Sequence, residues 1–439
     1  MDKEITEVKP MPGFMELLPQ DQIKFNQIKD TIEKYYKKFG FLPLDTQIIQ
    51  DSNVLLAKAG GETEKQIYRF NKGDNDLCLR FDLTVPLARY VAMKQNELVF
   101  PFKRYELGKS YRGEKAQKGR YREFYQFDVD VIGKDTLPLY YDAELPAIAY
   151  NIFKELDFGD FEIVMSNRKM FNGLLEALNI SEKSCDILRL VDKFYKIGKD
   201  NVIACLQDLK LEESQIKTIV DFISLTGSND EIIAKLYEMQ KLLNNPTFLE
   251  GINEMEQVVK MIREQGVEEK YFRIDLTITR GLDYYTGTVY ETFLKDHKDV
   301  GSICSGGRYD NLASHYTKQK LPGVGISIGL TRLFYKLQEK DLIKNTEKSI
   351  SKVLVVNMTN DLSSSIKLAT FLRKNDINTE VFCQETKFKN KLNYANKQNI
   401  PFVAILGEDE IASNTVSLKN MTTGEQQTVT YENCLNLLK

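Results

Sequence analysis

The chain has 439 residues, of which 42% are hydrophobic and 28% are charged, and its formal net charge is −3 at pH 7. This length can hold two or three domains with their own cores, and the composition is ordinary for a globular protein. The sequence has no run of about 18 apolar residues and no apolar core in its first residues, so we expect neither a membrane span nor a secretory signal. The slightly acidic balance gives no global basic field, although local basic patches can still bind phosphates.

The six cysteines and two histidines form no recognisable metal-binding pattern. The cysteines are scattered without a Cys-x-x-Cys pair, which favours reduced thiols over disulfides or zinc. His297 and His315 are too few for a histidine-rich metal site, and we expect both in solvated loops or at helix ends. The sequence therefore predicts a cytoplasmic protein that provides no metal ligands of its own.

The first predicted element is a helix over residues 21–40. Apolar residues recur there at roughly helical spacing: Ile23, Ile28, Ile32 and Tyr35. Gly40 suits the end of that helix. The next stretch, FLPLDTQII (residues 41–49), is typical of a strand.

Residues 77–90 (LCLRFDLTVPLARY) interrupt an apolar alternation with three polar side chains. Arg80, Asp82 and Thr84 lie two residues apart, so on a strand they would share one face. That face is either solvated or part of a pocket. A carboxylate next to a hydroxyl offers the acceptors that an ammonium group needs.

Residues 103–122 are the most basic stretch, with eight Lys and Arg against two glutamates. A run of this kind is often a solvated face. Its internal order is more specific: YRGE (111–114), a glycine-containing loop KAQKG (115–119) and RYREFYQFD (120–128). Gln126, Asp128 and Asp130 then alternate on one strand face, which is either a surface carboxylate row or a pocket wall.

The middle of the chain is predicted to be largely helical. Residues 142–156 have the pattern of an amphipathic helix, and residues 161–165 that of a strand. From about 167 to 265 the chain is rich in Lys and Glu, and four segments carry helical apolar spacing: 173–180, 185–194, 201–209 and 254–262. These features predict a helical subdomain and nothing more specific.

The segment RGLDYYTGTVYE (280–291) contains an arginine beside a glycine and two adjacent tyrosines. The planar arginine fork suits phosphate or carboxylate, and adjacent tyrosines on an extended segment point to opposite faces. TVYETFL (288–294) is typical of a strand. The alternative is a surface arginine, a turn and a strand with two core tyrosines. Downstream, CSGGRYD (304–310) predicts a Gly-Gly turn that lies close to a ligand.

The C-terminal third contains two further patterns. PGVGISIGLTRL (322–333) predicts a strand that enters a helix near Gly329, with Arg332 in its first turn; its glycine spacing is wrong for a dinucleotide fingerprint. Residues 338–351 are charged and read as a linker. Residues 352–439 alternate strands and helices, which predicts an α/β domain with a mostly parallel sheet. A generic nucleotide-binding module is disfavoured there, because no glycine-rich phosphate loop follows the first strand.

Together these segments resemble the histidyl-tRNA synthetases, a family of class II aminoacyl-tRNA synthetases. RGLDYYTGTVYE and GSICSGGRYDNL (301–312) are similar to the two histidine-specific motifs of that family, in the right order. Three further stretches resemble class II motifs 1, 2 and 3, respectively: about residues 23–50, 102–130 and 322–333. Motif 1 departs from the family pattern, because Gln47 replaces the expected proline and Gln50 the following acid.

The resemblance implies roles for particular residues. It implies a histidine pocket made by Asp82, Leu83, Thr84, Gln126, Asp130, Arg280, Tyr284 and Tyr285. Within it, Asp82–Thr84 would hold the α-amino group, and Asp130 and a tyrosine hydroxyl would satisfy the two ring nitrogens. It also implies contacts to ATP: Arg112 would bind the α-phosphate, and Glu114 would bind the adenine edge. Arg120 would lie near the outer phosphates, and Arg332 would contact both the γ-phosphate and the adenine face. Arg112 and Arg280 would be the catalytic residues that flank the α-phosphorus.

The resemblance also implies the fold and the domain organisation. Residues 1–337 are expected to form an α+β class II catalytic domain, which is an antiparallel sheet flanked by helices with a helical insertion at about 167–265. A linker (338–351) would join it to a C-terminal α/β anticodon-binding domain (352–439).

The implied function is that of a histidine–tRNA ligase. Such an enzyme activates L-histidine with ATP, accompanied by Mg²⁺, and transfers it from histidyl-adenylate to the 3′ end of tRNA(His); a homodimer is expected. One alternative is a catalytically silent paralogue that acts as a regulatory or sensor subunit, and another is a plain RNA-binding module. The retained arginines and C-terminal domain disfavour the first alternative, and the histidine-pocket residues disfavour the second.

Overall fold

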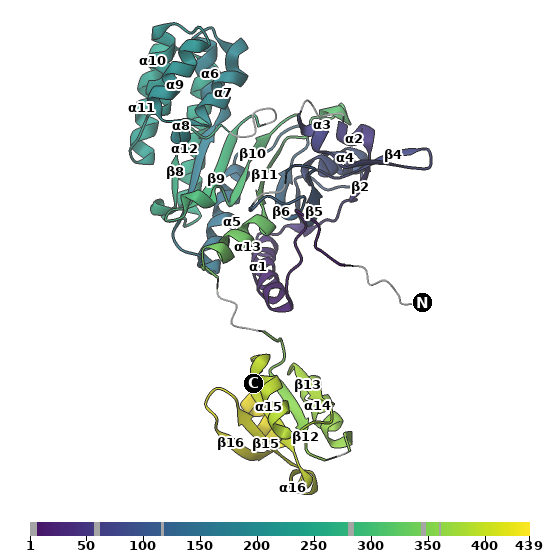
Figure 1. Ribbon diagram of the computed structural model, residues 1–439. Coiled ribbons are helices and arrows are strands. Elements are labelled where there is room, and N and C mark those ends of the chain that lie inside the picture. The colour runs from purple at the N-terminus through teal and green to yellow at the C-terminus, as the bar shows by residue number, and fades with distance from the viewer. Residues whose placement is uncertain (1–6, 57–61, 116–117, 280–284, 344–347, 360) are drawn as a thin grey trace. The chain divides into compact units, whose positions relative to one another are not determined.

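The computed structural model describes six stretches of the chain: residues 7–56, 62–115, 118–279, 285–343, 348–359 and 361–439 (Figure 1). By their contacts the residues form two compact units, each of which is described by itself. The first comprises Met1–Met15 and Asp30–Leu342, and the second comprises Glu16–Lys29 and Ile343–Lys439. No described helix combines the length and the apolar character needed to cross a membrane.

The first unit is built on an eight-stranded sheet in the order β1-β5-β6-β11-β10-β9-β7-β8. In that order the strands are β1 (Leu42–Pro43), β5 (Phe102–Tyr111), β6 (Glu123–Ile132), β11 (Gly323–Ile328), β10 (Cys304–Tyr309), β9 (Thr288–Leu294), β7 (Phe161–Asn167) and β8 (Phe272–Ile274). The six central strands pair antiparallel, and the two edge strands pair parallel to their neighbours. The predicted antiparallel sheet is confirmed, and β9 has the predicted bounds.

The two faces of this sheet differ in character, as β6 shows. Phe127, Val129 and Val131 are buried on one face, where the Tyr36 ring of helix α1 meets the Phe127 ring edge-on at 5.0 Å. Since alternate strand residues point to opposite faces, the residues between them point to the other, polar face. Figure 1 shows helices gathered on one side of the sheet: α5 (Tyr140–Leu156), α13 (Leu330–Glu339) and, from Asp30 on, α1 (Pro19–Lys38).

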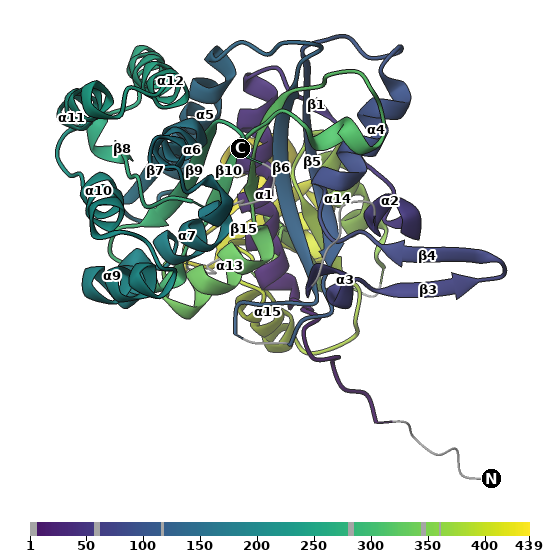
Figure 2. The same ribbon diagram turned by 90° about the horizontal axis from the view of Figure 1, so that it is seen from above.

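A smaller antiparallel sheet, β2-β4-β3, carries a hairpin that projects from the first unit (Figure 2). Its strands and accompanying helices are β2 (Ile49–Asp51), β3 (Arg69–Lys72), β4 (Asn75–Leu79), α2 (Ser52–Leu56), α3 (Glu62–Gln66) and α4 (Thr84–Lys94). The single strand predicted for 41–49 is wrong. Only β1 and the first residue of β2 form there, because the backbone N–H and the hydroxyl of Thr46 donate to Glu106 at 2.9 and 2.7 Å instead of joining a strand ladder.

The strand face predicted for Arg80, Asp82 and Thr84 is also wrong. Strand β4 ends at Leu79, and helix α4 begins at Thr84. Oδ1 of Asp82 accepts a hydrogen bond from the backbone N–H of Val85 at 3.0 Å. This contact satisfies one of the amide groups that a helix start leaves unpaired, so the polar residues mark a helix N-terminus rather than a strand.

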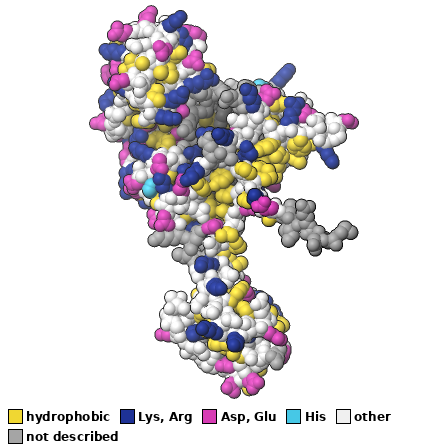
Figure 3. Space-filling view, viewed as in Figure 1, with side chains coloured by type: hydrophobic (Ala, Val, Ile, Leu, Met, Phe, Trp, Pro, Cys, Tyr) yellow, Lys and Arg dark blue, Asp and Glu magenta, His cyan; other side chains and the backbone are white. Residues whose placement is uncertain are grey.

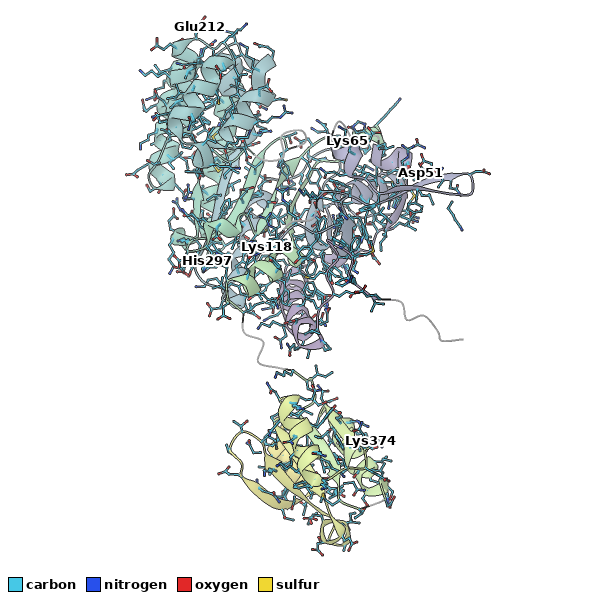
Figure 4. All side chains as sticks on the ribbon, in the orientation of Figure 1. Asp51, Lys65, Lys118, Glu212, His297 and Lys374 are labelled. Carbon is cyan, nitrogen blue, oxygen red and sulfur yellow. The ribbon has the colours of Figure 1, made fainter. Side chains whose placement is uncertain are left out.

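The predicted helical subdomain is confirmed. It contains α6 (Arg168–Ala177), η1 (Ser181–Lys183), α7 (Ser184–Val191), α8 (Phe194–Ile197), α9 (Lys199–Asp208), α10 (Glu213–Ile223), α11 (Asn229–Leu243), α12 (Pro246–Glu264) and η2 (Glu269–Tyr271). Both ribbon views place it beside the β7–β8 edge of the sheet, with Glu212 labelled at its outer end (Figures 1, 2 and 4). Helices α6 and α12 approach closely at a glycine, since a Cβ on Gly173 would lie 2.3 Å from the backbone nitrogen of Phe248.

Two predictions for residues 297–315 have different outcomes. His297 precedes η3 (Lys298–Val300) and His315 ends η4 (Leu312–His315), so the expectation of loops or helix ends is confirmed. The predicted Gly-Gly turn is wrong, because Gly306 and Gly307 lie within β10. A Cβ on Gly306 would lie 2.0 Å from the carbonyl oxygen of Gly325, so glycine permits close approach of two strands.

The second unit contains a five-stranded sheet in the order β13-β12-β14-β15-β16. Its elements are β12 (Val353–Asn357), α14 (Ser363–Lys374), β13 (Thr379–Phe382), α15 (Phe388–Lys397), β14 (Phe402–Leu406), α16 (Glu408–Ala412), β15 (Thr415–Asn420), β16 (Gln426–Thr430) and α17 (Tyr431–Leu438). The first three strands pair in parallel, and β15 and β16 add antiparallel pairs. The sheet is therefore mixed rather than mostly parallel, because a hairpin without a strong sequence signal completes it.

Candidate active site

A cavity of about 480 Å³ opens on the polar face of the eight-stranded sheet. Its lining comes from the start of α4, the β5–β6 hairpin, strands β10 and β11, and the start of α13. Cross-strand pairing aligns one row of this face: Arg104 pairs with Asp130, Asp130 with Gly325, and Gly325 with Gly307. The row therefore places two charged side chains next to two glycines, which have no side chain.

Asp130, in the cavity wall, is held by two neighbours. Its Oδ2 lies 2.7 Å from Nη2 of Arg104, and its Oδ1 accepts a hydrogen bond from the Tyr309 hydroxyl at 2.8 Å. A Cβ on Gly325 would lie 2.0 Å from Oδ1 of Asp130, and a Cβ on Gly323 would lie 2.3 Å from the Tyr309 ring. Asp130 and Tyr309 can meet across β11 only because β11 carries glycine beneath both.

The neighbouring residues of β6 offer hydrogen-bond acceptors to the cavity. Gln126 Nε2 donates to the Ser327 hydroxyl at 3.1 Å. Among the described residues, neither Gln126 Oε1 nor Asp128 Oδ1 has a hydrogen-bond partner, although both atoms are buried. Because buried polar atoms in folded proteins are normally paired, these two suit a ligand that carries N–H groups.

Burial changes the ionisation of both aspartates. It raises the pKa of Asp128 to about 7, against the opposing effect of Arg104. It also raises the pKa of Asp130 above its ordinary value, while Arg104 and the hydrogen bond from Tyr309 act in the opposite direction. Arg104 thus favours the charged form of both carboxyl groups, and the hydrogen bond from Tyr309 favours that of Asp130 in addition.

Asp82 and Thr84 line another wall, at the start of α4. The side chain of Leu83, between them, is fully buried and does not line the cavity. The helix start thus presents its carboxylate and hydroxyl to the cavity and its apolar residue to the core.

Three arginines line the cavity near the hairpin loop: Arg112, Arg120 and Arg332. The Arg112 guanidinium lies over two phenylalanine rings, 4.4 and 5.0 Å from their centroids. Nη1 of Arg120 lies 3.3 Å from Oε2 of Glu114, and Nη2 of Arg332 donates to a backbone carbonyl at 3.0 Å. Three guanidinium groups around one space favour a polyanionic ligand, because each can bind phosphate oxygens bidentately.

The hairpin loop that carries these residues meets helix α13. The Tyr121 and Tyr335 rings lie 5.8 Å apart, nearly perpendicular, and Lys118 Nζ is 4.0 Å from Glu339 of α13. Figure 4 labels Lys118 on the body of the first unit. These contacts join the described part of the loop to α13, whose Arg332 also lines the cavity.

Comparisons with known proteins identify the family. The family model described as "Histidyl-tRNA synthetase" matches residues 13–333, and the one described as "Anticodon binding domain" matches residues 352–439.

The chain belongs to the histidyl-tRNA synthetase family.

Similar proteins support this assignment over the full length. A histidine–tRNA ligase of Clostridium tetani is 53% identical and covers 100% of both chains, and one of Finegoldia magna is 46% identical over 98% of this chain and 99% of its own. A crystal structure of histidyl-tRNA synthetase from Nostoc sp. PCC 7120 is 38% identical, with a TM-score of 0.93 and 99% of each chain covered. The predicted class II catalytic fold with a C-terminal anticodon-binding domain is thereby confirmed.

A second structural match shares the fold alone. It is titled as an ATP phosphoribosyltransferase regulatory subunit/histidyl-tRNA synthetase from Bacillus halodurans. It is 21% identical, with a TM-score of 0.73, and covers 89% of this chain and 97% of its own.

The cavity brings together most of the residues that the synthetase motifs predicted: Asp82, Thr84, Arg112, Glu114, Arg120, Gln126, Asp130, Tyr285 and Arg332. The side chain of Leu83 is buried and does not line the cavity. Arg280 and Tyr284 lie outside the described residues. The two departures in motif 1 contact each other, because Gln50 Nε2 donates to the backbone carbonyl of Gln47 at 2.5 Å.

Sequence reasoning assigned no role to Arg104, Tyr309 or Ser327, and it gave Asp128 only a place on a strand face. The signal for Arg104 was available, since it alternates with Glu106 on the strand before the hairpin. For Tyr309 the spacing to Asp130 is 179 residues, so only the pairing of β6, β11 and β10 could bring the two together.

Proposed function

We infer that this protein is a histidine–tRNA ligase. It converts L-histidine and ATP to histidyl-adenylate and pyrophosphate, and then transfers the histidyl group to the 3′ end of tRNA(His). The observation that carries this inference is one cavity, in a chain of this family, that joins a buried aspartate to three arginines. An aspartate with further acceptors suits the imidazole and ammonium groups of histidine, and the arginines suit a triphosphate.

Asp130 reads the imidazole ring in this proposal. Its carboxylate accepts an N–H from the ring, and a tyrosine hydroxyl from Tyr284 or Tyr285 serves the second ring nitrogen. Support comes from the position of Asp130 in the cavity wall and from its fixed contacts to Arg104 and Tyr309. A pocket built around such polar groups rejects amino acids that would leave them unpaired.

A second group of predicted residues holds the α-ammonium end of the histidine substrate. Asp82 and Thr84 accept hydrogen bonds from the α-ammonium group, and Gln126 lies alongside. Leu83 contributes by packing the start of α4 against the core, since its side chain is buried. These roles are supported by the cavity that all three polar residues line.

The arginines organise ATP for in-line attack. The histidine carboxylate oxygen bonds to the α-phosphorus while the bond to pyrophosphate breaks, so the protein needs no nucleophile of its own. Arg112 and Arg280 flank the α-phosphorus and offset the charge that develops there. Arg120 and Arg332 hold the outer phosphates, with Arg332 also against the adenine face, and Glu114 reads the adenine edge.

Mg²⁺ enters with the nucleotide in this proposal. Within the described ranges, no group of three or more His, Cys, Asp or Glu side chains is placed to hold a metal ion. Magnesium commonly keeps several waters and binds through substrate phosphates rather than in an all-protein cage. When bound, it would neutralise charge on the leaving pyrophosphate, close to Arg120 and Arg332.

The tRNA is held by three regions. The loop at residues 115–119 reaches the acceptor end, where its lysines offset backbone charge. The helical subdomain (about 167–265) lies beside the acceptor arm, and residues 352–439 read the anticodon. The match of residues 352–439 to an anticodon-binding family supports the last assignment. We keep the proposed catalytic domain at 1–337 and the linker at 338–351, although α13 extends into the first two linker residues.

The protein acts as a homodimer in the cytoplasm in this proposal. Large apolar side chains remain exposed around the motif 1 strands and the small sheet, among them Leu42 at 62%, Ile49 at 49% and Val99 at 84%. Figure 3 shows hydrophobic side chains gathered on one face of the first unit. An exposed apolar patch of this kind marks a protein interface, and a second copy is the expected partner.

Histidine-dependent ATP–pyrophosphate exchange tests the function. Purified protein should exchange labelled pyrophosphate into ATP with histidine and not with glutamine or without an amino acid, and should then charge tRNA(His). A silent regulatory paralogue would show no exchange, and a plain RNA-binding module would bind tRNA without it. Either result would refute the proposed function.

A further inference from the structure

We propose that Arg104 is a positioning residue of the histidine pocket, which keeps the Asp130 carboxylate ionised and aimed at the imidazole. The inference rests on the proposed function and adds a residue that does not touch the substrate. Arg104 is fully buried and does not line the cavity. Any effect of Arg104 on histidine must therefore act through its neighbours, of which Asp130 is the nearest charged side chain in the cavity wall.

The two residues are directly opposed in the β5–β6 hairpin. Opposed side chains on one face of an antiparallel pair are close neighbours, and here Nη2 lies 2.7 Å from Oδ2 of Asp130. From the other side, β10 supplies the Tyr309 hydroxyl to Oδ1 at 2.8 Å. The carboxylate is thus fixed at both oxygens by two different strands. An ionised carboxylate has about four lone-pair sites, so it can still accept an N–H from a ligand.

Arg80, equally buried, shows the contacts of a structural arginine. Its Nε donates to the carbonyl of Lys109 at 2.7 Å, and its Nη1 donates to the Thr46 carbonyl at 2.7 Å and to Glu106 at 2.9 Å. Arg104 has no such set: within the part of the chain that the structure describes, none of its three guanidinium nitrogens has a partner with hydrogen-bond geometry, and its ion-pair partners are Asp130, 2.7 Å from Nη2, and Glu106, 3.7 Å from Nη1. Burying unpaired donors is costly, so packing does not explain Arg104, whereas a need for positive charge beside Asp130 does.

The other surroundings of Asp130 mostly favour its neutral form. Burial acts in that direction, and so does the negative charge of Glu106 on β5. Asp128 lies two residues away on β6, and Tyr36 of α1, on the opposite, apolar face of the sheet, is close enough for the charges of both aspartates to raise its pKa. Among the described residues, Arg104 and the Tyr309 hydrogen bond oppose them. Without Arg104, the pKa of Asp130 would rise further, and its protonated form presents a donor where the imidazole N–H needs an acceptor.

The test is Arg104→Met, which removes the charge and keeps a long apolar side chain. The KM values for histidine and for ATP are measured in pyrophosphate exchange between pH 6.5 and 9, each as a ratio to the wild-type protein at the same pH, so that titration of free histidine cancels. Each unit by which the pKa of Asp130 exceeds the assay pH reduces its ionised fraction about tenfold. We therefore expect the histidine ratio to be highest at the acid end of this range and to fall toward one as pH rises, by up to about tenfold per pH unit, with the ATP ratio near one throughout.

Three further variants separate positioning from folding. Arg104→Lys keeps a cation without the planar fork and should recover part of the loss. Arg80→Met is the matched control, which should lower the melting temperature without a pH-dependent histidine ratio. In an Asp130→Asn background, Arg104→Met should have little additional effect on the histidine KM, because the group through which it acts is already neutral.

A histidine ratio that does not change with pH would overturn the inference, and so would an equal rise in the KM values for ATP and histidine. So would a full additional loss from Arg104→Met in the Asp130→Asn background. The proposed function fails differently, because the wild-type protein itself would then lack histidine-dependent exchange.

Discussion

The eight-stranded sheet of the first unit and the five-stranded sheet of the second differ most in what they bury. Strand β12 of the second unit alternates Val353 and Val355 toward one apolar cluster with Leu354 and Val356 toward another, and all four are fully buried. In the first unit, one face of β5 and β6 buries four charged residues: Arg104, Glu106, Asp128 and Asp130. The same strand alternation thus serves packing in one sheet and chemistry in the other.

The difference follows from the energetics of burial. Each fully buried aliphatic side chain stabilises a fold by about 1.5–3 kcal/mol, whereas a buried ion pair is often no better than an apolar pair of similar volume. The charged face of the first sheet therefore is not there for stability. Removing one charged partner leaves the other buried and uncompensated, so each substitution there needs a stability measurement beside the activity measurement.

Among substitutions that test this difference between the two sheets, Asp130→Ala should have the largest effect on activity. A pocket built to bond a polar substrate group discriminates by about 10⁴–10⁵ when that bond is lost, so the histidine KM should rise steeply while the ATP KM stays nearly unchanged. Asp130→Asn should be intermediate, because an amide still accepts one hydrogen bond without carrying charge. Steady-state pyrophosphate exchange measures both constants. Equal weakening of ATP and histidine would mean that Asp130 supports the hairpin instead.

Arg280→Ala tests the catalytic assignment that rests on the family motif. Removing one contact aimed at the developing charge of a transition state costs about 10²–10³ in rate. The variant should fold normally, with an unchanged melting temperature, and lose adenylate formation by that factor. Exchange within a few-fold of the wild-type rate would refute the role of Arg280.

Removal of residues 352–439 should divide the two activities. The apolar five-stranded sheet lies wholly in that segment, and every described residue of the cavity lies outside it. Pyrophosphate exchange should stay within a few-fold of wild type, while charging of tRNA(His) falls sharply. Circular dichroism first establishes that the truncated protein is folded. Equal losses of both activities would contradict an independent C-terminal domain.

Asp128→Asn should give the smallest effect, and it is visible in stability. Burial raises the pKa of Asp128 to about 7 in the folded protein, and an unfolded aspartate has a pKa of about 3.9. The stability that goes with the protonated form is fully present below the unfolded value and is lost as pH rises through about 7. In thermal melts, the melting temperature of the variant should therefore rise relative to that of the wild-type protein from pH 4 to pH 7. A constant difference in melting temperature would contradict the raised pKa.

The sequence by itself determined much of this protein, because local patterns report local structure. Period-two alternation identified the wall Gln126–Asp130, and helical spacing identified the helical subdomain. The strand Thr288–Leu294 and the strand–helix junction at Gly329 were also predicted correctly. The rare motif at 280–291 pointed to the family, which the comparisons then established.

Tertiary structure decided what depends on neighbours far apart in the chain. The turn between Leu79 and Thr84 looks like strand alternation until Asp82 is seen to bond the first turn of α4. Gly306 and Gly307 look like a turn, but the strands on both sides of β10 hold them extended. The contact of Asp130 with Tyr309 requires three strands in one register and two glycines between them. No local propensity encodes such a contact, since its energy exists only once the sheet has formed.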